Sequence, residues 1–480
     1  MKKIITLTLA IAMLLGLTLP LTSCSTALLL SRMEETKRAY NFYSITDFNM
    51  NYASSAMYEQ KMTLDATING SAYKQTTEAT VTFASDRNGL TLLEKSKTTV
   101  DVIGGGTVIY SDTGYADGMM FSYTKEGANE TKLKSAVSLE DFSTYNRYRN
   151  ANAPAVVVDA DHAKTVTCKK NEDKTWSATY EGFTAEGLLP FLYMLRGIDY
   201  YLTAEHDLVD VRMTVNADAQ LYPTGTKIEF IFAENPDTET AIPVVTMETT
   251  YYGWNSTTPE AYDIESFNEV DDLRAMHIFL DALLDKSYEE SGRVDITAVS
   301  TVTTDSYDTT QTNKQTLTFD QKDELTFVLI SENEAFLYNM NYSDGEFCVR
   351  IYDPTDNSLL DTTTEPMTYV EARATVAQLM DSEGLTSRSI KGVEIVDAEA
   401  GICRFALSDA FKNAYKEEYE AMGVTLSTFK GYCEATIADG ELTSYRFHME
   451  MTLRVSGESI QSVVDMTISF SSANYGAEAV

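Results

Sequence analysis

Internal repetition constrains the fold of this chain more than any other feature. Gly114–Gly118 (GYADG) matches Asn341–Gly345 (NYSDG), and Ala217–Leu221 matches Ala438–Leu442 at nearly the same spacing along the chain. Each match is short, but the matches occur in the same order in both halves. Collinear matches predict a tandem duplication, so the fold of one copy should occur twice.

Two further matches extend the repeat. Thr82-Phe83 matches Thr318-Phe319 at a slightly wider spacing than the pentapeptides. Trp176–Met194 lies against Cys403–Ala421 at the same spacing as the pentapeptides, with strand-then-helix character in both. The changes of spacing need only small insertions, which turns tolerate. The duplication therefore covers most of each half.

Alternating, Thr-rich segments in each copy are typical of β-strands. In the first copy they are Lys61–Ala72, Thr77–Ala84 and Gly89–Thr99. Helical spacing predicts helices near Thr184–Leu195 and near Ser408–Met422. Runs of strands that are broken by helices favour an α+β fold with an antiparallel sheet. We therefore expect two tandem repeats, each a curved antiparallel sheet packed with a few helices.

The first 24 residues predict the location of the protein. Lys2 and Lys3 precede an apolar run from Ile4 to Leu19, which is the pattern of a secretory signal peptide. Leu21-Thr22-Ser23-Cys24 then resembles the lipobox of bacterial lipoproteins. That resemblance implies cleavage before Cys24, attachment of diacylglycerol to its thiol, and anchoring on the extracytoplasmic face of the cell membrane. The alternative is a plain secretory signal with a chance cysteine.

These features divide the chain into four parts. We expect a lipoprotein signal peptide at 1–23, a lipid anchor and tether at 24–40, repeat domain 1 at 41–256, and repeat domain 2 at 257–480. The second boundary follows from Asn255-Ser256-Thr257-Thr258-Pro259, a cluster of turn-forming residues that interrupts the repeat.

The charge of the chain excludes one class of partner. Lys and Arg number 37 against 72 Asp and Glu, which gives a formal charge of −35. Nucleic-acid binding requires clustered basic residues, so we exclude it as a general function. Because the mature chain loses Lys2 and Lys3, its charge falls to −37. An anionic bilayer should repel such a body, which is then held by its lipid alone.

The order of the elements carries a resemblance to a known family. A lipobox, an entry helix, meandering strands around Tyr115-Ala-Asp117-Gly118 and a long final hairpin look like the LolA/LppX-type lipoprotein carriers. They also look like many uncharacterised Gram-positive surface lipoproteins. The resemblance implies a curved antiparallel sheet over helices that shelters an acyl chain or a lipopeptide. It transfers no ligand-contact residue, and a tandem pair departs from the single-domain carriers.

One segment is apolar on nearly every side. It runs from Leu188 to Leu195, and its counterpart in the second copy is polar. An ordinary surface helix has one apolar stripe, so this helix is deep core, lines an apolar cavity, or docks on the second copy. Methionines suit loosely shaped apolar ligands, so Met119-Met120-Phe121 is added to the candidate cavity. The candidate cavity residues are Leu188, Leu189, Phe191, Leu192, Leu195, Met119 and Phe121.

Nothing in the sequence has the pattern of a catalytic or metal site. The four histidines, His162, His206, His277 and His448, form no HxH or HExxH motif. Cys168, Cys348, Cys403 and Cys433 show no CxxC spacing; Cys403 and Cys433 form a disulfide or remain buried free thiols. We therefore expect no enzyme activity, no cofactor and no metal.

Two functions remain from this reasoning. The first is a membrane-anchored, non-enzymatic lipoprotein that binds an apolar or lipid-like ligand. The second is an envelope scaffold that contacts another protein and has no small-molecule ligand. An apolar cavity in the structure would favour the first.

Overall fold

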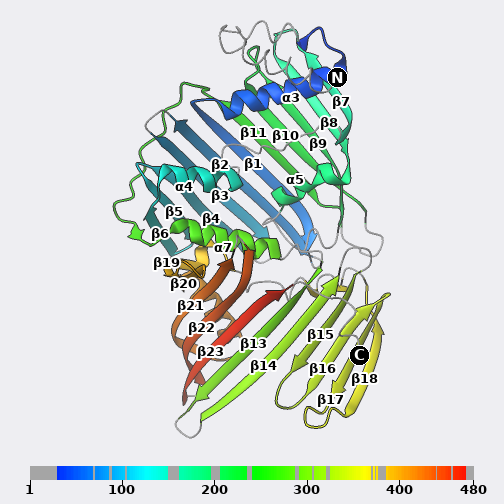
Figure 1. The fold of residues 1–480 in the computed structure, drawn as a ribbon, viewed down its shortest axis with the longest axis vertical. Helices are drawn as coiled ribbons and strands as arrows, with labels where there is room; N and C mark the ends of the chain where they lie inside the picture. The colour runs from blue at the N-terminus through cyan, green and yellow to red at the C-terminus, as the bar shows by residue number, and fades with distance from the viewer. Residues whose placement is uncertain are drawn as a thin grey trace.

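Two large β-sheets dominate the molecule (Figure 1). The computed structural model describes residues 30–68, 71–85, 89–102, 105–149, 162–195, 206–234, 241–286, 291–304, 308–320, 325–368, 371–372, 375–376, 385–438, 441–455 and 458–471. Strands make up 62% of the structure and helices 18%. The expected α+β class, with a few helices packed in each repeat, is therefore wrong: the protein is mostly β.

The first sheet has 12 strands in the order β12-β6-β5-β4-β3-β2-β1-β11-β10-β9-β8-β7. The pairs are antiparallel except for the short β12–β6 pair. Its strands are β1 (Ser55–Ile68), β2 (Ser71–Ser85), β3 (Leu90–Val102), β4 (Gly105–Ala116), β5 (Met119–Glu126), β6 (Asn129–Ala136), β7 (Ala163–Lys170), β8 (Trp176–Phe183), β9 (Leu208–Ala217), β10 (Pro223–Phe232), β11 (Val244–Tyr252) and β12 (Asn268–Glu269).

The second sheet has 11 strands in the order β18-β17-β16-β15-β14-β13-β23-β22-β21-β20-β19. This order repeats that of the first sheet strand for strand, apart from β12. Its strands are β13 (Ser291–Thr303), β14 (Asp308–Asp320), β15 (Thr326–Glu332), β16 (Leu337–Ser343), β17 (Glu346–Tyr352), β18 (Leu359–Pro366), β19 (Ile390–Asp397), β20 (Ile402–Leu407), β21 (Thr425–Ala438), β22 (Glu441–Val455) and β23 (Glu458–Ser471).

The matching pentapeptides form equivalent turns. GYADG joins β4 to β5 and NYSDG joins β16 to β17. Asp117 and Gly118 have φ of 52° and 78°, and Asp344 and Gly345 have φ of 53° and 78°. Two successive positive φ angles are the geometry of a tight hairpin turn whose twist matches its strands, and Asp-Gly accepts it at low cost. The sequence match therefore reflects one turn used twice.

The α+β prediction failed because several strands lack a clean alternation. β6 (NETKLKSA) is largely polar, and all eight residues of β18 are exposed, so neither has the pattern of a half-buried strand. The expected strand over Lys61–Ala72 runs past the end of β1 at Ile68 into β2. Because the sequence indicated fewer and shorter strands than the structure contains, the helices were expected to form a larger part of each repeat than they do.

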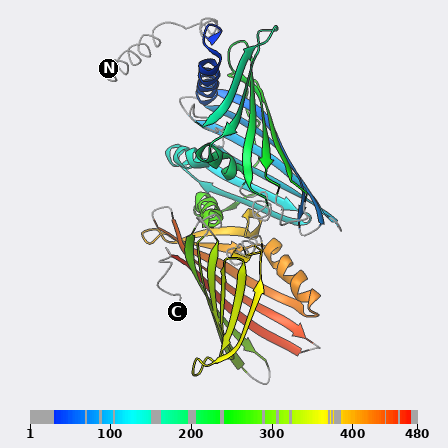
Figure 2. The same cartoon turned by 90° about the vertical axis from the view of Figure 1, so that its right-hand side faces the viewer.

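In the described part of the chain, the helical segments with defined bounds are α3 (Glu35–Asn51), α4 (Leu139–Arg149), α5 (Ala185–Leu195), α7 (Leu273–Lys286), the 3-10 turn η1 (Ser387–Ser389) and α9 (Asp409–Ala421). Figures 1 and 2 show α3, α4 and α5 on one face of the first sheet, which we call its inner face. Within the described ranges, none of the helices combines the length and apolar character that a membrane-spanning helix requires.

Helix α7 joins the two sheets. One apolar core includes Tyr58 and Leu133 from the first sheet, Phe279 from α7, and Phe405 and Phe447 from the second sheet. A second core, around Phe42 and Trp176, belongs to the first sheet alone. Because the larger core crosses from one sheet to the other, the sheets pack as a single body.

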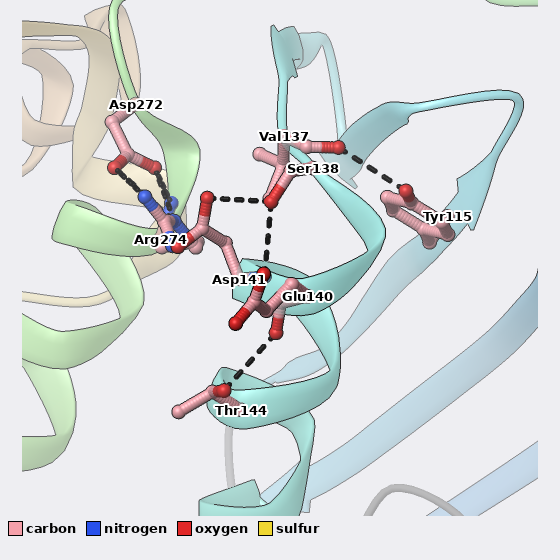
Figure 3. A network of polar contacts seen from close by, with 8 residues as sticks. All are labelled: Tyr115, Val137, Ser138, Glu140, Asp141, Thr144, Asp272 and Arg274. Carbon is pink, nitrogen blue, oxygen red and sulfur yellow. Dashed lines mark hydrogen bonds and ion pairs between the residues drawn. The ribbon is translucent and has the colours of Figure 1, made fainter.

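Polar contacts reinforce this junction (Figure 3). The Ser138 hydroxyl accepts a hydrogen bond from the backbone N–H of Asp141 (3.1 Å) and donates one to its carboxylate (2.6 Å), which caps α4. Arg274 of α7 pairs with that carboxylate at 3.2 Å and with Asp272 at 2.8 Å. The backbone N–H of Leu273 donates to Ser135 Oγ of β6 at 2.9 Å. The start of α7 is therefore fixed to the first sheet.

Candidate functional site

A narrow cleft with a cavity volume of about 30 Å³, open to solvent, lies between α3 and the inner face of the first sheet. Helix α3 forms one wall, and strands β9, β10 and β11 form the floor. The lining residues are Tyr43, Thr46, Asp47, Met50, Met213, Val215, Pro223, Thr226, Ile228 and Tyr251. This volume is far below the roughly 300–1,000 Å³ of small-molecule sites, so the cleft can enclose only a small part of a ligand.

Contacts at both ends hold α3 in place. Near its start, the Tyr180 hydroxyl donates a hydrogen bond to the Ala39 carbonyl at 2.7 Å, and Phe42 stacks on Trp176 with ring centroids 6.3 Å apart. Near its end, Asn49 Nδ2 donates to the Leu221 carbonyl at 2.9 Å. The cleft therefore has a fixed wall.

The floor of the cleft is apolar because of strand alternation. Met213 and Val215 on β9 and Ile228 on β10 point to the inner face, and the intervening side chains point away. Met213 pairs with Ile228 in the sheet, and Ile228 pairs with Met247 of β11. Methionine and branched aliphatic side chains side by side suit an apolar ligand of variable shape.

Polar groups also line the cleft. Burial raises the pKa of Tyr251 to about 12 and raises the pKa of Asp47 above its usual value. The buried Thr226 hydroxyl has no hydrogen-bond partner among the described residues, although it lies near the Tyr251 hydroxyl and lowers the pKa of that group. A mainly apolar cleft with a few polar groups is suited to an amphipathic molecule that has one polar end.

The apolar helix predicted from sequence is α5, and it packs in the core beside this cleft. Leu188, Phe191 and Leu195 are buried in the same apolar cluster as Met213 and Ile228. The Phe191 ring meets Phe183 edge-on at 5.0 Å and Phe230 at 6.4 Å. Leu192 is half-buried, and the side chain of Leu189 lies outside the described residues. Leu188, Phe191, Leu192 and Leu195 do not line the cleft.

The two residues predicted to join that helix lie elsewhere. Phe121 is buried with Leu93 and Phe267 and stacks on Tyr262 at 4.7 Å, in a separate apolar cluster. Met119 begins β5 and is half-buried. The structure therefore does not bring Phe121 to α5. The predicted lipidation site, Cys24, lies outside the described residues.

Sequence reasoning expected an entry helix but gave no bounds for α3, and it missed the cleft beneath that helix. Helix α3 begins at Glu35, within the segment assigned to the tether, and buries only Ala39, Phe42 and Thr46. So few buried positions give a weak helical pattern. The floor residues, such as Met213, come from strands in the far part of the same repeat. No spacing in the sequence signals that such distant segments meet.

A second, polar hollow of about 650 Å³ lies across β11, β1, β2, β3 and β4. Its charged residues alternate along each strand with inward-facing ones, so it lies on the outer face. Lysines and carboxylates are paired there: Lys61 with Glu78 at 3.2 Å, and Lys95 with Glu260 at 3.5 Å. This surface is polar and largely charge-balanced.

The other chemically reactive side chains are dispersed. In the part of the chain that the structure describes, no three His, Cys, Asp or Glu residues are placed to hold a metal ion. His448 contacts Asp465 at 2.9 Å on the second sheet, far in sequence from His162, which faces Glu186 at 3.5 Å. Cys403 and Cys433 are both buried free thiols, and burial raises the pKa of each.

Comparisons with known proteins yield only weak likenesses. No protein-family model matches the chain, and no curated protein matches it. Among solved structures, a double mutant of the vaccine antigen Transferrin Binding Protein B from Haemophilus parasuis Hp5 has 6% identity and a TM-score of 0.16, covering 87% of this chain and 76% of its own.

Two other solved structures are similarly weak matches. The translocator domain of autotransporter NalP from Neisseria meningitidis has 7% identity and a TM-score of 0.11, covering 89% of this chain and 92% of its own. A porin-like protein from Bacteroides uniformis has 8% identity and a TM-score of 0.10, covering 88% and 96%. Such low TM-scores carry no argument about fold or function.

Proposed function

We propose that this protein is a lipid-anchored extracytoplasmic lipoprotein that binds an apolar or lipid-like ligand in the cleft beneath α3. The observation that carries the proposal is the cleft itself: Met50, Met213, Val215 and Ile228 form an apolar surface beside a fixed helix. The proposed chemistry is binding without catalysis. The family resemblance stated from the sequence agrees with a ligand held between helix and sheet.

The anchor is proposed from the lipobox. Leu21-Thr22-Ser23-Cys24 supplies the recognition tetrad and the thiol. Two acyl chains on one residue anchor a protein stably, whereas one chain does not. We expect the wild-type protein in the membrane fraction with lipid on Cys24, and Cys24→Ser in the soluble extracytoplasmic fraction. Wild-type protein that is released without lipid would contradict the anchor.

Ligand binding is tested by native mass spectrometry of gently purified mature protein. A non-covalent mass that leaves on denaturation identifies the ligand, and uptake of a fluorescent fatty acid measures its affinity. Clean apoprotein that takes up neither a fluorescent fatty acid nor a fluorescent phospholipid would overturn the binding proposal.

A matched pair of variants on α3 locates the site. Met50 lines the cleft, whereas Phe48 on the same helix is exposed and stacks on Tyr52 at 4.3 Å. Met50→Glu places a charge in the cleft, so the affinity for the fatty acid should fall at least tenfold, which corresponds to about 1.4 kcal/mol. Phe48→Glu makes a similar change outside the cleft and should bind as the wild type does. Equal losses in both variants would place the ligand elsewhere.

A second candidate function rests on β18. This edge strand, Leu359–Pro366, is exposed along its whole length, and Leu359 and Leu360 are more than half exposed. An open sheet edge is a template for a strand from another protein. The exposed carboxylates of Asp361 and Glu365 on β18 would repel an acidic partner strand. Cross-linking from β18 to one envelope protein, in a protein that takes up no lipid, would favour the scaffold function.

A further inference from the structure

The folded body begins very close to the proposed lipid. Leu30 is only 1% exposed and belongs to the core of the first sheet. Arg38 holds this point, since its Nε donates to the Leu30 carbonyl at 3.2 Å and its Nη1 donates to the Cys168 carbonyl at 3.0 Å. Six residue steps separate Cys24 from Leu30, so even a fully extended tether spans only about 20 Å.

Basic side chains gather around this attachment point. Arg32 and Lys37 flank the residues that Arg38 contacts, and Lys169 and Lys170 directly follow Cys168 on β7. Lys174 lies in the turn from β7 to β8. All five side chains are exposed, and none forms an ion pair with another described residue; Lys170 lies over the Trp176 ring at 5.5 Å.

The local charge is opposite to that of the whole chain. Residues 30–38 and 168–175 contain six basic and four acidic side chains, in a protein whose net charge is −35. Of the four carboxylates, Asp173 is engaged by Thr175, whose N–H donates at 3.0 Å and whose hydroxyl donates at 2.6 Å. Charge complementarity therefore favours an anionic surface at this end, although the body as a whole should be repelled.

We propose that the end of the first sheet formed by residues 30–38 and the β7–β8 hairpin docks on the anionic phospholipid surface of the membrane. The inference rests on the proposed lipid anchor at Cys24. The short tether keeps this end within about 20 Å of the bilayer. At physiological salt, charge interactions act over about 8 Å, so the bilayer interacts with the charges of this end, where basic side chains outnumber acidic ones, and not with the acidic remainder of the body. The body therefore leans on the membrane rather than standing clear of it.

Docking at this end sets the orientation of the whole molecule. Figure 1 shows α3 and β7 at one end of the long axis and β14 to β18 at the other. The second sheet, with its exposed β18 edge, would then project away from the membrane. The cleft beneath α3 lies in the membrane-proximal half, where a lipid leaving the bilayer has the shortest path to it.

The test is lysine footprinting of the lipidated mature protein. The protein is reconstituted in vesicles of phosphatidylcholine alone or of phosphatidylcholine mixed equally with phosphatidylglycerol, and lysines are acylated and counted by mass spectrometry. Lys169, Lys170 and Lys174 should react several-fold more slowly on the mixed vesicles, and high salt should abolish the difference. Lys314 and Lys391 on the second sheet are exposed and should react equally on both.

Charge reversal supplies the control. Lys169→Glu with Lys174→Glu should remove the protection of Lys170 while leaving the protein anchored. Lys314→Glu with Lys391→Glu makes the same change of charge on the second sheet and should leave the protection intact. Equal reaction rates on both vesicles, with the protein retained, would overturn the docking proposal alone. Loss of the protein from both vesicles would overturn the anchor, and the docking proposal with it.

Discussion

Helices α3 and α7 occupy equivalent places in the two sheets but fill them differently. Each precedes the first strand of its sheet. The residues of these two strands correspond at the same spacing as Thr82 and Thr318: Tyr58 pairs with Val81 in the first sheet, and their counterparts Val294 and Leu317 pair in the second. Helix α7 buries seven side chains, whereas α3 buries three. The same topology therefore produces a filled junction in one place and an open cleft in the other.

The difference traces to particular substitutions in the helices. At the same spacing, Asp47 of α3 corresponds to Leu283 of α7, and Tyr43 corresponds to Phe279. Phe279 is fully buried and stacks on Phe405 at 4.7 Å. In α3 the corresponding ring is half-buried and lines the cleft. A carboxylate in place of leucine cannot be covered without cost, so this part of α3 stays open to solvent.

The floors of the two sheets differ in the same sense. Met62 and Ala298 are equivalent positions of the repeat. Met62 pairs with Met247 in the first sheet and Ala298 pairs with Met466 in the second, so Met247 corresponds to Met466. Their next neighbours then relate Ile228 to Phe447 and Thr226 to Tyr445. The second sheet places two large, buried rings where the first has isoleucine and threonine. Smaller floor residues and the carboxylate of Asp47 together leave the cleft open.

The largest expected effect tests α7 as the junction between the sheets. Phe279→Ala removes a fully buried ring from the shared core, which should cost about 3–5 kcal/mol of unfolding free energy. Tyr43→Ala, at the corresponding place in α3, should cost less than half of that, because its ring is only half-buried. Urea unfolding measures both. Equal losses of unfolding free energy would show that α3 is packed as tightly against its sheet as α7 is.

Asp47→Leu should make α3 resemble α7. Burial raises the pKa of Asp47, and a raised carboxylate pKa means that stability is greatest below the unfolded value and is lost as pH rises through the folded value. Leucine removes that loss and adds apolar burial, so we expect a gain of about 1–2 kcal/mol near neutral pH. Binding of a fatty acid should weaken as the cleft closes. Thermal unfolding across pH checks the first point; a less stable variant would contradict it.

The polar part of the junction should be acid-sensitive. The Ser138 hydroxyl and then Arg274 lower the pKa of Asp141 below 3.8, so this contribution is present above that pH and is lost as pH falls through the folded value. Arg274→Met also breaks the pair with Asp272 and should cost about 1 kcal/mol at neutral pH. Its stability should then fall less on acidification than that of the wild type. An unchanged acid profile would show that Arg274 does not act through Asp141.

The repeat and an antiparallel sheet in each copy were predicted from the sequence, whereas the full extent of the sheets and the cleft were not. GYADG and NYSDG are local turns, so short matches were enough to find them. The cleft depends on β11 returning to pair with β1, which brings β9 and β10 under α3. That pairing joins Met62 to Met247 across most of the first half, and no local pattern encodes it. β18 was missed for a simpler reason, because a fully exposed edge strand has no buried side to alternate.

The smallest expected effect concerns Thr226, whose hydroxyl is buried in the floor of the cleft and forms no hydrogen bond with a described residue. A buried hydroxyl that has lost water and gained no partner is destabilising, so Thr226→Val should raise the unfolding free energy by about 0.5–1 kcal/mol. Thr63→Val is the control: its hydroxyl bonds that of Thr246 at 2.8 Å, so the same change should destabilise the protein. If Thr226→Val also loses stability, then Thr226 and Tyr251 form a real hydrogen bond. The polar group of a ligand would then have to compete with the hydrogen bond between Thr226 and Tyr251. If stability rises instead, the hydroxyl stands ready for such a group, and Thr226→Val should weaken binding of a fatty acid while it strengthens the fold.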